Sequence, residues 1–157
     1  MAEIKEILSK YKKIAMIGVS NDPTKASTIV MKYMQGYGFK VYPINPKAKG
    51  QKILGEEVFE KITDIKEEVD IVEVFRPSKE ALAIAEDTVK IGAKVLWLQL
   101  GIRNEDAKKI VESKNIKYVE NKSLKFRVEY LLLINNRIKK IKGNTALSTK
   151  LLCHNLL

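Results

Sequence analysis

The sequence predicts an α/β protein, a Rossmann-like doubly wound parallel sheet of about five strands in three α/β/α layers. Short apolar blocks recur along the chain with segments of helical periodicity between them, an alternation typical of parallel β-α-β units. The strand candidates "IVEVF" and "KVLWLQL" are almost continuously apolar, as expected for a sheet that helices cover on both faces. A chain of 157 residues fits one such domain with a substantial core.

The same periodicities place the individual elements. Strands are expected at 14–19, 40–44, 69–75, 93–98 and 116–119, with a short additional strand near 57–59. Helices are expected at 1–11, 25–37, 78–91 and 104–113, with Ser78 as the N-cap of the third. Numbering the five main strands along the chain, we expect the order 3-2-1-4-5. In the first helix, one face is apolar and carries Ile4, Ile7, Leu8 and Tyr11.

The C-terminal segment differs from the rest of the chain. Residues 126–157 hold six basic residues against Glu129 alone, around the apolar run "YLLLI". The chain is therefore expected to consist of a domain at 1–125 and a basic extension of unknown role at 126–157. An extra helix, an arm that contacts a second copy or another protein, and a poorly ordered extension all remain open.

Composition excludes several classes of function. The formal net charge is +10, but Lys and Glu alternate along most of the chain and no basic segment is interleaved with aromatic residues, so nucleic acid is not an expected partner. No apolar run approaches the roughly 18 residues of a membrane span. The charged N-terminus and the single cysteine, Cys153, favour a cytoplasmic location. No His, Cys or paired carboxylates gather near the strand ends, so no metal site is expected.

In an open parallel sheet, ligands bind beyond the carboxyl ends of the strands. After the first strand come Gly18, Val19 and Ser20, and the next helix begins near Lys25 and Ser27. Hydroxyls, a lysine and a helix N-terminus together favour an anion, although Gly18 alone could simply serve a tight turn. The two further glycines of the NAD fingerprint are missing.

The end of the second strand, "PINPK", discriminates between ligands. An NAD site typically has an acidic side chain here that accepts hydrogen bonds from the ribose hydroxyls, and residues 40–50 contain none. Asn45, Pro46 and Lys47 stand there instead, and a lysine would attract a phosphate carried by the ribose. The alternative is an exposed turn with solvated lysines.

The third and fourth strands end in "FRP" and "LQLGI". Phe75 and Pro77 could flank an adenine ring, with Arg76 pairing a phosphate or a carboxylate, or Arg76 could be a plain surface cation. Glu73 lies within the third strand and needs a partner if buried; Arg76 or a ligand hydroxyl could serve. The segment 98–102 offers an amide and exposed backbone to a polar ligand.

Five segments in register carry a resemblance to a known family: "IAMIGVSNDPTKAS", "GFKVYPINPK", "GEEVFEKITDI", "DIVEVFRP" and "AKVLWLQLGIRNEDA". Over about residues 11–125 the chain resembles the CoA-binding domain family of small Rossmann-like proteins. More distantly, it is similar to the N-terminal domain of the succinyl-CoA synthetase alpha subunit. Ser123 stands where the family often has a cysteine, so no thiol role is carried over to that position.

The resemblance implies a site for the nucleotide end of coenzyme A. Its residues would divide into four groups along the ligand: Gly18, Val19 and Ser20 at the pyrophosphate with Lys25 and Ser27 nearby; Asn45, Pro46 and Lys47 at the ribose 3′-phosphate; Phe75, Arg76 and Pro77 at the adenine; and Gln99, Gly101 and Ile102 along the pantetheine path.

The expected function is that of a non-catalytic module that binds CoA or an acyl-CoA. The only histidine, His154, and the only cysteine, Cys153, lie in the extension, and neither Glu73 nor Asp70 has a nucleophile beside it in sequence. Two alternatives stay open. One is an NADP-linked oxidoreductase, which would share the lysines but not the glycine pattern; the other is an enzyme that handles acyl-CoA together with a partner subunit.

Overall fold

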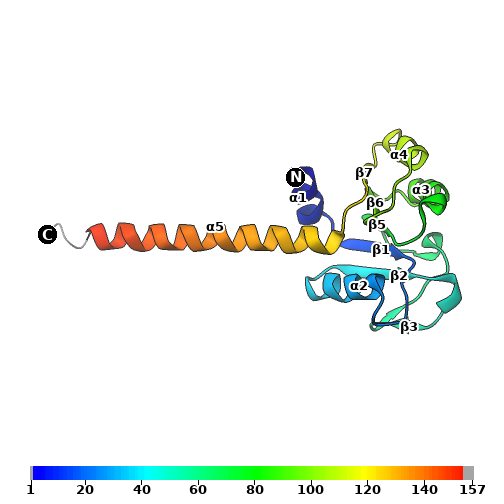
Figure 1. Cartoon of the computed structure of the whole chain (residues 1–157), viewed down its shortest axis with the longest axis horizontal. Helices are drawn as coiled ribbons and strands as arrows, with labels where there is room; N and C mark the ends of the chain where they lie inside the picture. The colour runs from blue at the N-terminus through cyan, green and yellow to red at the C-terminus, as the bar shows by residue number, and fades with distance from the viewer. Residues whose placement is uncertain (1, 154–157) are drawn as a thin grey trace. The chain divides into compact units, whose positions relative to one another are not determined.

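The computed structural model describes residues 2–153, with side chains described for residues 3–138. Five parallel strands form the main sheet, in the order β2-β1-β5-β6-β7 (Figure 1). Their bounds are β1 Lys13–Ile17, β2 Lys40–Ile44, β5 Ile71–Val74, β6 Val95–Leu98 and β7 Lys117–Val119. In the register of the sheet, Ile14 of β1 lies opposite Val41 on one side and Ile71 on the other. This parallel α/β sheet confirms the predicted fold class.

Helices cover both faces of the sheet. They are α1 (Ala2–Lys10), α2 (Ala26–Gly36), α3 (Ala81–Lys90) and α4 (Glu105–Glu112). Val72 of β5 and Leu96 of β6 belong to one buried cluster with alanines from α3 and α4, among them Ala85 and Ala107. The amphipathic first helix is confirmed by the burial of Ile4, Ile7 and Leu8.

Shorter elements connect the strands. They include the antiparallel pair β3 (Lys52–Ile53) and β4 (Glu56–Glu57), and the 3₁₀ turns η1 (Pro46–Ala48), η2 (Ile62–Asp64) and η3 (Ser78–Glu80). The short strand expected near 57–59 is represented by β4 and by a parallel bridge between Ile44 and Phe59. The predicted N-cap at Ser78 is wrong, because α3 begins after η3 and the Ser78 hydroxyl instead accepts the backbone N–H of Arg103 at 3.1 Å.

The predicted strand order is also wrong. Numbered along the chain, the main strands lie in the order 2-1-3-4-5, because β5 pairs with β1 rather than with β2. The apolar pattern of a strand indicates its burial, but it does not specify on which side of the sheet the following strand will pair. The observed order places the reversal of winding between β1 and β5, which is where ligands bind in this topology.

The chain divides into two compact units between Lys125 and Phe126. Of the alternatives left open for the extension, the structure has a helix, α5 (Leu124–Cys153); His154 lies outside the described residues.

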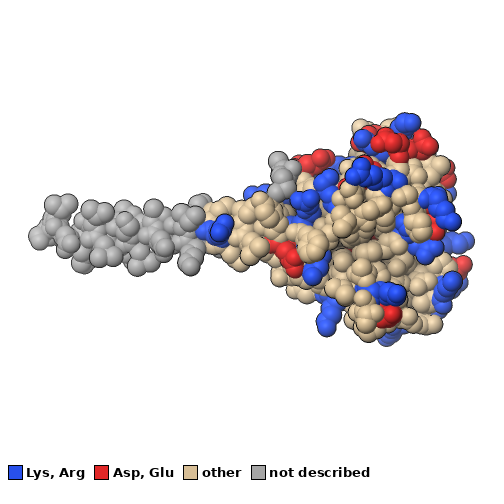
Figure 2. Space-filling model, in the orientation of Figure 1, with Lys and Arg blue, Asp and Glu red and all other residues tan. Residues whose placement is uncertain are grey.

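On the face of the first unit visible in Figure 2, Lys and Arg are interspersed with Asp and Glu. Among the described helices, none is both long and apolar enough to cross a membrane.

Gly18, immediately after β1, lies where two strand ends approach closely. Its φ is +90°, and its N–H donates to the carbonyl of Ile44 at 2.9 Å. A Cβ at this position would lie 2.9 Å from Cδ of Arg76 and 3.1 Å from the carbonyl oxygen of Phe75. The position therefore requires glycine both for its backbone conformation and for the space beside it.

We expect Gly18→Ala to destabilise the protein more than Gly38→Ala. Gly38 also has a positive φ, +80°, but a Cβ there would meet nothing within 4 Å. Backbone strain should reduce the free energy of unfolding by about 1–3 kcal/mol in both variants, and overpacking should add about 1–3 kcal/mol at Gly18 alone. Urea denaturation of the two variants measures the difference; equal losses would contradict the role of close approach.

Candidate functional site

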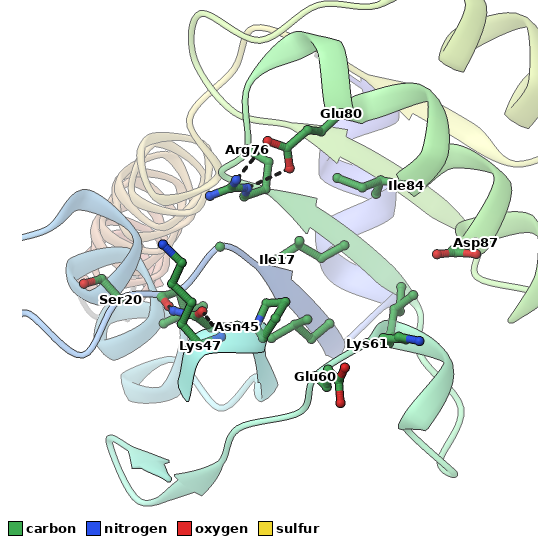
Figure 3. Close-up of a pocket in the computed structure, with 15 residues that line it drawn as sticks. Ile17, Ser20, Asn45, Lys47, Glu60, Lys61, Arg76, Glu80, Ile84 and Asp87 are labelled. Atoms are coloured by element: carbon green, nitrogen blue, oxygen red, sulfur yellow. Dashed lines mark hydrogen bonds and ion pairs between the residues drawn. The ribbon is translucent and has the colours of Figure 1, made fainter. Parts of the chain in front are cut away.

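A cavity of about 490 Å³ opens at the carboxyl ends of β1, β2 and β5 (Figure 3). This is the point where the winding of the sheet reverses, and the volume lies in the range typical of small-molecule sites. Seven of the residues proposed from the sequence line the cavity together: Gly18, Val19, Ser20, Asn45, Pro46, Lys47 and Arg76.

The loop after β1 is held in place from two sides. The backbone N–H of Ser20 donates to the hydroxyl of Ser27 at 3.2 Å, and the hydroxyl of Thr28 donates to the carbonyl of Ser20 at 2.6 Å. On the other side, the amide of Asn45 donates to the carbonyl of Val19 at 2.9 Å. Side chains from α2 and from the end of β2 thus fix the backbone of residues 19–20 at the cavity.

Two residues expected near the ligand, Lys25 and Ser27, lie at the start of α2. Ser27 is buried, with 5% of its surface exposed, and its hydroxyl is engaged by Ser20. Lys25 is exposed and stands at the backbone N-cap of α2 without a capping side-chain bond. Neither residue lines the cavity.

The end of β2 carries a capped turn. Oδ1 of Asn45 accepts the backbone N–H of Lys47 at 3.0 Å and so caps η1, with Pro46 at its first position. The side chain of Lys47 is exposed and lines the cavity. The cap starts a turn that places Lys47 at the cavity.

The end of β5 places Arg76 at the cavity. Nε and Nη2 of Arg76 donate to the two carboxylate oxygens of Glu80, each at 2.8 Å. This bidentate pair lowers the pKa of Glu80 and raises that of Arg76. Phe75 and Pro77, which flank Arg76 in sequence, do not line the cavity.

The residues that follow β6 also lie outside the cavity lining. The amide of Gln99 donates to Oε1 of buried Glu73, so Gln99 is the partner of Glu73, not Arg76 or a ligand as expected. The N–H of Gly101 donates to the side chain of Asn121 at 2.8 Å. Ile102 is half-buried and packs against the core.

Sequence reasoning missed more than half of the cavity lining. The missed residues are apolar or charged: Ile17, Ile44, Ile62, Ile84, Glu60, Lys61, Glu80 and Asp87. One signal was present in the sequence, because Glu80, Ile84 and Asp87 are spaced by four and three residues and so share one face of a helix. The rest come from loop and turn segments that the fold alone brings to the cavity.

The acidic side chains of the cavity all form ion pairs, whereas two of its lysines form none among the described residues. Each acidic side chain has a basic partner: Glu60 with Lys49 at 2.7 Å, Glu80 with Arg76, and Asp87 with Lys90 at 2.8 Å. Lys47 and Lys61 form no ion pair among the described residues, so the lining favours an anionic ligand. No group of three potential metal ligands occurs in the described part of the chain.

The fold is that of a small Rossmann-like protein, and its cavity lies at the position where such proteins bind nucleotides. The chain belongs to the CoA binding domain family, whose model matches residues 12–129. The resemblance predicted from the sequence is thereby confirmed.

Relatives and solved structures agree with this assignment. The chain is 38% identical to the uncharacterized protein YneT of Bacillus subtilis, over 72% of this chain and 82% of that protein. A hypothetical protein from Pyrococcus horikoshii has a structure with a TM-score of 0.80 and 36% identity, over 83% of this chain and 91% of that one. The alpha subunit of the ADP-forming acetate–CoA ligase I of Pyrococcus furiosus is 31% identical over 67% of this chain, but only 24% of that subunit is covered.

Glu73 lies in the middle of β5 with none of its surface exposed. Its Oε2 atom has no hydrogen-bond partner among the described residues, while Oε1 accepts from Gln99. Burial raises the pKa of this carboxyl from 4.5 to about 8, against the opposing effect of the Gln99 bond. At neutral pH the folded protein therefore holds Glu73 mainly in its neutral, protonated form.

We expect this carboxyl to make stability fall as the pH rises from about 4.5 to about 8. In that window the unfolded chain releases the proton that the folded chain keeps, which costs at most about 1.4 kcal/mol per pH unit. Glu73→Gln removes this component, so its stability relative to the unmodified protein should increase from pH 5 to pH 8. Urea denaturation across this range tests it, with the exposed Glu68→Gln as control; a difference that stays constant with pH would contradict the assignment.

Proposed function

We propose that the protein binds coenzyme A or an acyl-CoA through its nucleotide end in this cavity, and acts as a binding module without catalysing a reaction. The observation that carries the proposal is the pairing pattern of the cavity: every acidic side chain of the lining forms an ion pair, while Lys47 and Lys61 form none among the described residues. An anionic nucleotide suits such a lining, and membership of the CoA binding domain family supports the choice of CoA.

The polar part of the cavity fits the phosphates. The backbone of residues 18–20 would face the pyrophosphate, and Lys47 would contact the ribose 3′-phosphate. Residues 45–50, directly after β2, include no carboxylate, and Asn45 already uses its oxygen to cap η1. Glu60 of the cavity lining is paired with Lys49 at 2.7 Å. These features favour a phosphorylated ribose over that of NAD.

The apolar part of the cavity fits the base. Ile17, Ile44, Ile62 and Ile84 line it, and we assign the adenine to these side chains in place of Phe75 and Pro77. The pantetheine arm would then leave the cavity along the sheet edge, past the backbone of Gln99, whose side chain is buried against Glu73, and past Gly101 and Ile102 after β6.

Three features support binding without catalysis. The cavity lining contains no His or Cys. Its carboxylates are all engaged in ion pairs, so none is placed as a free general base. Glu73 is fully buried and bonded to Gln99, away from solvent.

We expect CoA to bind more tightly than dephospho-CoA or NAD. A charge-assisted contact of Lys47 with the 3′-phosphate should contribute about 1.5–3 kcal/mol, which corresponds to roughly ten- to a hundredfold in affinity. Lys47→Glu should remove most of this preference. Lys52→Glu is the matched control, because Lys52 is exposed on β3 and does not line the cavity.

Calorimetric titration of the three ligands against the three proteins measures these affinities. Equal affinity for CoA and dephospho-CoA in the unmodified protein would remove Lys47 from the site. Tightest binding of NAD would overturn the proposed function.

A further inference from the structure

Among the described residues, the guanidinium of Arg76 is held along one edge, by Glu80. Glu80 takes one N–H from Nε and one from Nη2, in a side-on bidentate pair with both distances at 2.8 Å. A guanidinium has five N–H donors in a rigid plane. The second N–H of Nη2 and one N–H of Nη1 therefore form a fork on the neighbouring edge, and the other N–H of Nη1 points to the Cδ side.

The aliphatic stem of Arg76 occupies the space left by the missing side chain of Gly18. Its Cδ lies where a side chain at position 18 would begin, 2.9 Å from an ideal Cβ on Gly18. The missing side chain lets the stem lie across the end of β1 into the cavity. Figure 3 shows the amino end of Lys47 pointing toward the guanidinium of Arg76, on the same side of the cavity as Ser20.

We infer that Glu80 is a positioning residue: it holds Arg76 so that the free N–H groups of the guanidinium and the amino group of Lys47 together grip the ribose 3′-phosphate of the ligand. This inference rests on the proposed function and adds to it a two-cation clamp and the residue that sets it. Arg76 is then a phosphate ligand of the site rather than an adenine neighbour.

The sign of a substitution at Glu80 separates positioning from simple electrostatics. A carboxylate beside an anion site repels the ligand, so if Glu80 did no more than this, its neutralisation would strengthen binding. If Glu80 orients Arg76, its neutralisation frees a long side chain that the ligand must then order, which costs affinity.

We expect Glu80→Gln to weaken CoA binding about three- to tenfold, the range that corresponds to ordering one long side chain. Asp87→Asn is the matched control, because Asp87 lines the same cavity but pairs with Lys90 and not with Arg76. The same loss of negative charge there should raise CoA affinity slightly. In an Arg76→Gln background, Glu80→Gln should no longer weaken binding, since Glu80 acts through Arg76.

The measurement is calorimetric titration with CoA and, in parallel, with inorganic phosphate as a probe of the 3′-phosphate position. Stronger or unchanged CoA binding by Glu80→Gln, or an equal weakening with and without Arg76, would overturn the positioning role while leaving CoA binding intact. Phosphate binding that depends on Lys47, Arg76 and Glu80 without any CoA binding would support the clamp and overturn the proposed function. Binding of neither probe by the unmodified protein would overturn both.

The double charge reversal Arg76→Glu with Glu80→Arg adds a structural control. It retains an ion pair between residues 76 and 80, just before α3, but moves the guanidinium from residue 76 to residue 80. Thermal unfolding should stay close to that of the unmodified protein while CoA affinity falls as far as in Arg76→Gln. Restored CoA affinity in this variant would show that the ion pair, and not the place of Arg76, matters.

Discussion

The close approach of the ends of β1 and β5 is the constraint on which the site depends. These strands pair in parallel, and the chain leaves β1 through Gly18, whose positive φ and missing side chain admit Arg76 and the backbone of Phe75. The same pairing creates the reversal of winding between the two strands. The cavity, the loop that borders it and the place of Arg76 all follow from this one contact between strand ends.

Around that contact, polar side chains form hydrogen bonds with the backbone of the loop that borders the cavity. Ser27 and Thr28 from α2 hold Ser20, and Asn45 holds Val19 while also capping η1. A loop fixed in this way loses little conformational freedom when a ligand binds, so more of the interaction energy remains for affinity.

The ion pairs of the cavity reduce the negative charge that its carboxylates would present to a ligand. Exposed pairs such as Glu60 with Lys49 contribute little to stability, but they neutralise carboxylates that would otherwise repel an anion. The buried carboxyl of Glu73 is treated differently, since the fold keeps it neutral through burial and bonds it to Gln99. Both arrangements reduce negative charge at the carboxyl edge of the sheet.

The sequence by itself determined the fold class, the approximate bounds of the strands and helices, and the family, because hydrophobic periodicity and local motifs are written in neighbouring residues. It also identified the strand ends, and seven of the residues named there line the cavity. Tertiary structure decided the strand order, the partners of Arg76 and Glu73, and the cavity positions of residues such as Lys61 and Ile84. The physical reason is that pairing between strands and contacts between loops join residues far apart in the chain, and a local pattern does not specify which of several similar apolar strands will become neighbours.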